Sequence, residues 1–269
     1  MVIKLSGLTF FTKHVLTLLT VFSCGLMAFI VKAQTIVPST LTAEEFSELH
    51  QCDKKFAYDI YFLGKKVGYL HRTIQWHKNS TSPQAVITSY GEVSFLWIDS
   101  TYQQKSTMQY SPQYQHFLTA SFSQKLTGIK ARAMKTKMSA NGLSSTVTLN
   151  GEVSHYQSIN ESEKQPLYDI DSLGAQIRLN LLQGKVHFNL SRQASSRVEN
   201  YQFEVAGLEV IDHKKWGKLT TIKVIEVGEH KDIVLWFSPK HDHQLIKAQL
   251  DMMFSPVVWL SHFSRQCEQ

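Results

Sequence analysis

The densest group of metal-ligand residue types in the sequence is the triplet His241-Asp242-His243, with His213 and His230 upstream of it. Imidazole nitrogens and carboxylate oxygens are common zinc ligands, but zinc sites usually gather them from several separate strands or helices. The triplet instead stands between Ser238-Pro239 and a predicted strand. We therefore expect a solvated turn here, without a metal ion.

The sequence lacks the short motifs of the common catalytic classes. H-E-x-x-H, G-x-S-x-G, the Walker loop and the dinucleotide-binding glycine fingerprint are all absent. Ser261-His262 is an adjacent serine–histidine pair, but a catalytic triad is recognised by its geometry and not by adjacency in the chain. We therefore expect no catalytic residue and no cofactor, and we predict that the protein is not an enzyme.

One predicted strand is strongly basic and carries no acidic residue; its cations are Lys125, Lys130, Arg132, Lys135 and Lys137. Lys130 and Arg132 are two residues apart, so both should lie on one face of the strand. The residues of the other face, which we expect to pack inward, are Ile129, Ala131 and Ala133. Together the two cations could bind a phosphate or a lipid headgroup. An edge strand that charge protects from sheet-to-sheet association gives the same pattern and is the simpler interpretation.

Five tryptophans lie in or beside predicted strands, and aromatic residues make up 11% of the chain, which is enough to fill a core. Such side chains usually pack inside a barrel-like sheet, but they line an apolar cavity where the sheet is incompletely filled. The candidate ligand contacts are therefore Trp97 and Trp236, together with Lys130 and Arg132.

The amino terminus has the pattern of a secretory signal peptide. Lys4 and Lys13 precede an apolar run from Val15 to Val31, and Val31 and Ala33 are the apolar and small residues expected three positions and one position before a cleavage site. We expect cleavage after Ala33 and a periplasmic location. Two alternatives stay open, an uncleaved membrane anchor and lipidation at Cys24. Each of the three places the folded part outside the cytosol.

Without Cys24, the chain keeps two cysteines, Cys52 and Cys267. Two cysteines in an oxidising compartment are expected to form a disulfide, and only one connectivity exists. The closed loop of about 215 residues would stabilise the fold by roughly 4 to 5 kcal/mol. The bond requires the two Cα atoms to lie within about 7 Å, so the first and last elements should be neighbours. The alternative is a pair of unbonded structural thiols.

Charge argues against a dedicated nucleic-acid-binding protein. The 269 residues have a net charge of +6, but three of the lysines belong to the predicted signal peptide. The remainder is only weakly basic, at about +3.

The mature chain is dominated by residue patterns of period two, which are typical of β-strands. Turn signals such as Gly64, Asn141-Gly142 and Asn150-Gly151 separate these runs at the short spacing of an antiparallel meander. One segment instead has helical spacing, and we predict a helix from about 172 to 183, capped by Asp171 or Ser172 and ended by Gly184.

The predicted fold is mainly β, with one strongly curved antiparallel sheet or barrel-like meander, one inserted helix and a short N-terminal helix. Residues 1–33 form the signal peptide, residues 34–51 a linker with the short helix, and residues 52–269 a single β-rich domain.

Several motifs of the chain are similar to those of a known family: Asp171-Ser172-Leu173, the run from Tyr201 to Gly207 with Glu209, Gly217-Lys218-Leu219, Leu235-Trp236-Phe237-Ser238-Pro239 and Leu245-Ile246-Lys247. Over roughly residues 55 to 263 the chain resembles exported Gram-negative bacterial proteins of a domain-of-unknown-function family, DUF3108/DUF6134-like. The resemblance implies a strongly curved antiparallel sheet and export to the periplasm. It supplies no catalytic residue.

These observations predict a non-enzymatic periplasmic protein of the cell envelope that binds an apolar or lipid-like ligand in its curved sheet. The alternative is an assembly or scaffold protein of the envelope that acts through protein–protein contacts. The expected partners are a lipid or other envelope proteins, with peripheral membrane contact and no nucleic acid.

Overall fold

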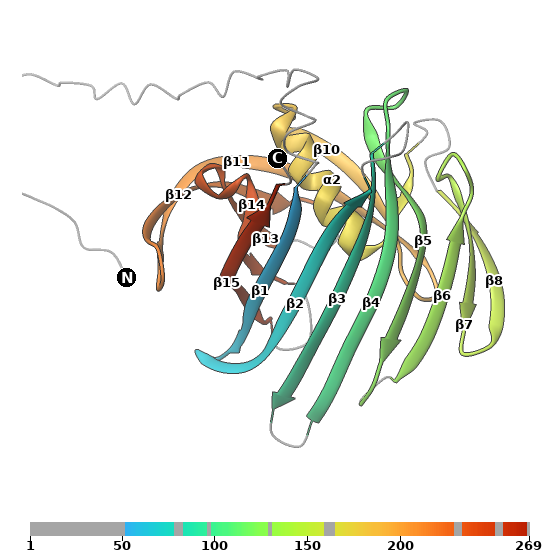
Figure 1. Ribbon diagram of the computed structural model, residues 1–269, viewed down its shortest axis with the longest axis horizontal. Helices are drawn as coiled ribbons and strands as arrows, with labels where there is room; N and C mark the ends of the chain where they lie inside the picture. The colour runs from blue at the N-terminus through green and yellow to red at the C-terminus, as the bar shows by residue number, and fades with distance from the viewer. Residues whose placement is uncertain are drawn as a thin grey trace, which may run out of the picture. The chain divides into compact units, whose positions relative to one another are not determined.

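The computed structural model describes residues 52–77, 83–95, 98–128, 131–158, 165–228, 233–250 and 255–267 (Figure 1). The predicted signal peptide, the linker and the N-terminal helix lie outside these residues. Trp97 and Lys130 also lie outside them.

The described residues form fifteen strands of one sheet, one α-helix and one short 3-10 helix. Their bounds are β1 (Asp53–Phe62), β2 (Lys65–His77), β3 (Gln84–Phe95), β4 (Ile98–Ser111), β5 (His116–Leu126), β6 (Arg132–Met138), β7 (Ser144–Leu149), β8 (Glu152–Gln157), β9 (Leu167–Tyr168), α2 (Ile170–Leu182), β10 (His187–Gln193), β11 (Val198–His213), β12 (Gly217–Glu226), β13 (Val234–Ser238), η2 (Pro239–His241), β14 (Gln244–Gln249) and β15 (Val257–Gln266). The mainly β fold with one inserted helix is as the sequence predicts.

The sheet runs from β8 through β1 to β15 and on to β9, so neighbouring strands are also consecutive in the chain except at its centre. There the first strand, β1, pairs antiparallel with the last strand, β15. The disulfide between Cys52 and Cys267 joins the ends of these two strands, with the Cα atoms 4.2 Å apart. The structure therefore contains the predicted bond and the predicted neighbours.

The sheet curves around α2, which packs against both of its halves (Figure 1). Leu173, Ile177 and Leu181 of the helix belong to the large apolar cluster, whose other members come mainly from β10 to β15, with Phe56 and Tyr58 from β1. Leu179 lies in a second cluster, with residues of β3, β4 and β5. We call the face of the sheet that carries α2 the inner face, and the opposite face the outer face.

The two ends of the sheet approach each other without pairing, so the sheet is curved and open rather than a closed barrel. Leu167 of β9 packs in an apolar cluster with Phe122 and Val147 of the other end. A side-chain hydrogen bond of 2.6 Å from Ser145 Oγ to Gln193 Oε1 also joins the two ends.

The helix begins two residues earlier than predicted, and its N-cap is Asp169 rather than Asp171 or Ser172. Asp169 Oδ1 accepts a hydrogen bond of 2.9 Å from the backbone nitrogen of Asp171, and the Ser172 side chain completes a capping box. Asp171 is not the cap because its carboxylate forms an ion pair of 2.6 Å with Arg72 of β2. Gly184 follows the helix with a φ of 69°, as predicted.

The predicted turn at His241-Asp242-His243 is present, but the expectation that it is solvated is wrong for the Asp242 carboxylate. Asp242 adopts a left-handed backbone conformation, and its carboxylate is buried between two cations. Lys54 Nζ lies 2.9 Å from Asp242 Oδ2, and Arg178 of α2 lies 2.7 Å from Oδ1. Arg178 also donates to the Asp242 carbonyl oxygen. Through these contacts, Asp242 joins β1 and α2 to the turn before β14. No metal-ligand cluster occurs among the described residues.

Reduction of the disulfide should lower the free energy of unfolding by about 2 to 5 kcal/mol, because the bond closes a loop of 215 residues in the unfolded chain. Urea unfolding with and without dithiothreitol measures the difference. The variant with Cys52→Ser and Cys267→Ser should match the reduced protein and be insensitive to dithiothreitol. Equal stability of the oxidised and reduced proteins would contradict this prediction.

Asp242→Asn should destabilise the protein by about 3 to 5 kcal/mol, because both buried cations lose the carboxylate charge with which they pair. Lys54→Met should cost much less, since Arg178 and Asp242 then remain as a neutral pair. Urea unfolding of both variants tests the difference. Equal losses of unfolding free energy in the two variants would indicate that the group stabilises the protein through packing and not through charge balance.

Stability should also rise with pH between about 8 and about 10. Burial and the nearby Arg178 charge lower the pKa of Lys54 to about 8, although Asp242 opposes the shift. An unfolded lysine titrates near 10.4, so the unfolded state binds more protons in this range, and raising the pH favours the folded state. Urea unfolding across this range should show the rise in the parent protein and not in Lys54→Met. Parallel pH profiles of the two proteins would rule out this role of Lys54.

Candidate anion-binding site

The predicted basic strand is in fact two strands, because Lys125 lies on β5, while Arg132, Lys135 and Lys137 lie on β6. β6 presents its lysines and its arginine on opposite faces. Met134, Thr136 and Met138 are buried on the inner face, while Lys135 and Lys137 are exposed on the outer face. Arg132 is half-buried and lies on the inner face, and Ala133 is exposed with the lysines. The expectation that Ala133 packs inward is therefore wrong.

The reason for this orientation is the larger apolar area of the two methionines. Met134 and Met138 pack with Phe122, Val147 and Leu167 in one cluster. Burying two methionine side chains is more favourable than burying alanine methyl groups. Successive side chains of β6 point to opposite faces of the sheet, so when the methionines are buried, Ala133 is left on the outer face.

The interpretation of the lysines as edge protection is also wrong for this strand. β6 pairs with β5 on one side and with β7 on the other. Its backbone groups already have partners, so charge is not needed to keep another strand away.

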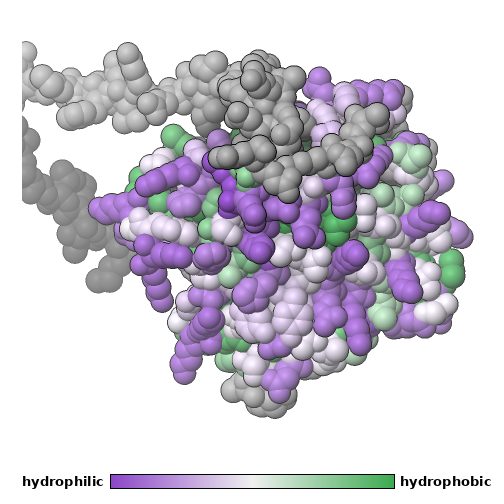
Figure 2. Space-filling model, viewed as in Figure 1, coloured by the Kyte–Doolittle hydropathy of each residue, from purple (hydrophilic) through white to green (hydrophobic). Residues whose placement is uncertain are grey.

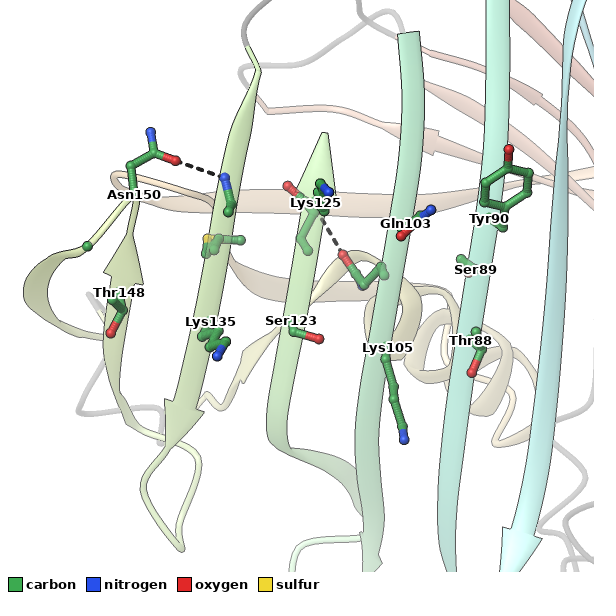
Figure 3. Close-up of a pocket in the computed structure, with 15 residues that line it drawn as sticks. Thr88, Ser89, Tyr90, Gln103, Lys105, Ser123, Lys125, Lys135, Thr148 and Asn150 are labelled. Carbon is green, nitrogen blue, oxygen red and sulfur yellow. Dashed lines mark hydrogen bonds between the residues drawn. The ribbon is translucent and has the colours of Figure 1, made fainter. Parts of the chain in front are cut away.

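The outer face over β3 to β7 contains a shallow depression of about 750 Å³, which we call the lysine depression (Figure 3). Three lysines from three adjacent strands line it, with small and polar residues between them. The outer-face residues of its lining are Thr88, Tyr90, Gln103, Lys105, Ser123, Lys125, Ala133, Lys135, Thr148 and Asn150. The surrounding surface over β1 to β8 is mostly hydrophilic (Figure 2).

Strand register places the three lysines around one serine. Ser123 of β5 lies directly opposite Lys105 of β4 and directly opposite Lys135 of β6. Lys125 is two residues further along β5, on the same face. Adjacent strands are about 4.8 Å apart, so three long, flexible ammonium side chains can reach one group above Ser123.

Small side chains leave the centre of the depression unfilled, and a hydrogen bond fixes one end of its rim. Ser123 and Ala133 are small, so no large side chain fills the space between the lysines. At one end, Asn150 is held against β6, because its Oδ1 atom accepts a hydrogen bond of 2.8 Å from the backbone nitrogen of Ala133. Asn150 and Gly151 both have positive φ, as the predicted hairpin turn requires.

The electrostatics of the depression favour an anion. Its lining includes no aspartate or glutamate, and none of the three lysines forms an ion pair within the described ranges. Hydroxyl and amide groups on Thr88, Ser123, Thr148 and Gln103 add further hydrogen-bond donors. Together these groups can bind phosphate oxygens.

The two predicted ligand contacts that the structure describes, Arg132 and Trp236, do not line this depression. Arg132 lies on the inner face, where its Nε atom donates a hydrogen bond of 3.2 Å to Gln124 Oε1. Trp236 and Leu235 are adjacent on β13 and point to opposite faces of the sheet. Trp236 is buried beneath two lysines, because Lys247 Nζ lies 4.1 Å and Lys223 Nζ lies 5.7 Å from the centre of its ring. Trp236 therefore takes part in cation–π contacts within the sheet rather than lining a cavity.

Lys105 is the member of the depression that sequence reasoning missed. It lies on β4, outside the basic run, and joins Lys125 and Lys135 only through strand pairing. The sequence contains a partial indication of this site, since the residues on either side of Lys105 and before Lys125 are small or polar.

No helix in the described part of the chain is long and apolar enough to cross a membrane. No curated protein is significantly similar to this chain. The crystal structure of a β-barrel-like protein of the domain of unknown function DUF1849 from Brucella abortus is similar with a TM-score of 0.49 and 9% sequence identity, over 80% of this chain and 98% of that chain.

Residues 57–259 match a family described as "Protein of unknown function (DUF3108)", in agreement with the resemblance seen in the sequence motifs. The match covers most of the chain and nearly all of the described sheet. The chain therefore belongs to the DUF3108 family.

Proposed function

We propose that the protein is a non-enzymatic component of the cell envelope that binds the phosphate-bearing headgroup of a lipid-like ligand in the lysine depression. The observation that carries the proposal is the convergence of Lys105, Lys125 and Lys135 in a depression without a carboxylate. The lysines come from strands inside the sheet, where edge protection does not account for them.

The chemistry of the depression suits a phosphate group better than a neutral ligand. Like charges on neighbouring strands repel each other, so their gathering is unfavourable until an anion lies between them. Hydrogen bonds with a charged partner contribute about 1.5 to 3 kcal/mol each where water is excluded, and less on an exposed face. Several contacts at once are therefore needed, and the arrangement around Ser123 offers them.

The periplasmic part of the proposal rests on other features. The apolar segment before Ala33 is typical of export. The Cys52–Cys267 disulfide supports a compartment that is oxidising. A lipid headgroup with a phosphate is a ligand that an envelope protein would meet there.

The test is binding to vesicles of phosphatidylglycerol, with vesicles of phosphatidylcholine as the neutral comparison. The variant with Lys105→Gln, Lys125→Gln and Lys135→Gln should bind the anionic vesicles at least tenfold more weakly than the parent protein. Co-sedimentation at low and moderate salt measures the affinity, and inorganic phosphate as a competitor shows whether the phosphate group alone is recognised.

The matched control is the variant with Lys65→Gln, Lys137→Gln and Lys218→Gln. It removes the same charge from exposed positions that do not line the depression. An equal loss in both triple variants would point to unspecific attraction and contradict the proposal. A parent protein that binds neither vesicle would also contradict it and would favour the scaffold role.

A further inference from the structure

Arg132 presents a guanidinium to the inner face of the sheet, and no carboxylate in the described part of the chain forms an ion pair with it. The residue is half-buried, and its Nε atom donates a hydrogen bond of 3.2 Å to Gln124 Oε1. Within the described residues, no hydrogen bond or ion pair is formed by its two terminal nitrogens. A cation that is partly removed from water gains stability when an anion binds to it.

The hydrogen-bond acceptors around Arg132 are already committed by a directed chain of amides. Gln124 Nε2 donates to Gln104 Oε1 over 2.9 Å. Gln104 Nε2 in turn donates to Asp169 Oδ1 over 2.7 Å and to Asp171 Oδ2 over 3.0 Å. If either amide turned its oxygen toward a terminal nitrogen of Arg132, the hydrogen bonds at the start of α2 would break.

The neighbouring charges do not neutralise Arg132 either. Burial and the nearby Arg192 guanidinium lower the pKa of Arg132. Arg192 has a partner, Glu199, at 3.3 Å, but the same carboxylate lies 2.7 Å from Arg197. The carboxylate of Asp171 is 2.6 Å from Arg72. The carboxylate of Asp169 accepts hydrogen bonds from Gln104 and Ser106. Within the described residues, none of these carboxylates therefore pairs with Arg132.

A row of mainly apolar residues leads away from Arg132 across the inner face. Strand pairing places one residue of each strand from β6 to β1 in register: Arg132, Leu126, Tyr102, Gly91, Leu70 and Tyr58. Leu126, Tyr102 and Leu70 are only partly buried, whereas Gly91 between them is buried, and a methyl group of Leu70 lies 3.2 Å from where a Cβ atom of Gly91 would stand. At about 4.8 Å per strand, the row from Arg132 to Leu70 is about 19 Å long.

We propose that this row binds a single-chain amphiphile with a carboxylate headgroup, with the carboxylate on Arg132 and the hydrocarbon chain along Leu126, Tyr102 and Leu70. A guanidinium whose two terminal nitrogens are both available can hold a carboxylate through two parallel hydrogen bonds. The apolar residues begin directly beside the cation, which is the order of parts in an amphiphile. This site lies on the opposite face from the lysine depression and does not depend on the function proposed for it.

The test is isothermal titration calorimetry with laurate, kept below its micelle concentration, and with lauryl alcohol as the uncharged probe. Arg132→Gln should bind laurate more than tenfold more weakly than the parent, while the two proteins should bind the alcohol equally. Arg132→Lys should keep part of the laurate affinity because it keeps the charge. Lys137→Gln is the matched control, since it removes the same charge from the outer face of the same strand.

Thermal unfolding separates a binding role from a structural one. Without laurate, Arg132→Gln should melt at or above the temperature of the parent, because the variant removes a cation that forms no ion pair with the described residues. Laurate should raise the melting temperature of the parent and of Lys137→Gln, but not that of Arg132→Gln. The proposal is overturned if Arg132→Gln binds laurate like the parent, if the parent does not bind it, or if the variant is markedly less stable without it.

Discussion

The ion pair between Asp171 and Arg72 is the interaction on which the curved sheet depends. It joins the first turn of α2 to β2 at 2.6 Å, and both groups are largely removed from water. A buried carboxylate needs several partners, and Asp171 obtains them from Arg72, Ser89 and Gln104 on three consecutive strands. These strands can all reach one helix end only if the sheet curves around it.

The capping residue Asp169 adds a second contact to β4 and extends the same constraint to one further strand, β5. Its carboxylate accepts hydrogen bonds from Ser106 of β4 and Thr119 of β5, at 2.7 Å and 3.3 Å. Both carboxylates are thus satisfied only when the helix sits at one position on the sheet. Buried polar networks of this kind specify an arrangement more strongly than apolar packing does, because each misplaced group would lose its hydrogen bonds.

The two candidate sites are consequences of this arrangement on opposite faces. The carboxylates orient Gln104 and Gln124, and these amides in turn hold Arg132 on the inner face. Alternation along β6 then places Lys135 on the outer face beside Ser123. The chain thus has one cationic environment that is lined with apolar residues and another that is lined with hydroxyl groups and open to solvent.

The sequence by itself determined the strands, the helix, the disulfide and the family. These features depend on local patterns, on turn residues such as Asn150 and Gly151, and on the existence of only one possible cysteine pair. Tertiary structure decided which face Arg132 occupies, because Ala133 and Met134 are both apolar and only the cluster around Phe122 and Val147 selects the methionine. It also decided that β6 is not an edge strand, that Lys105, Lys125 and Lys135 meet from three separate strands, and that Asp242 is buried between two cations. Each of these depends on which segments become neighbours, and that is set by long-range packing rather than by the periodicity of any one strand.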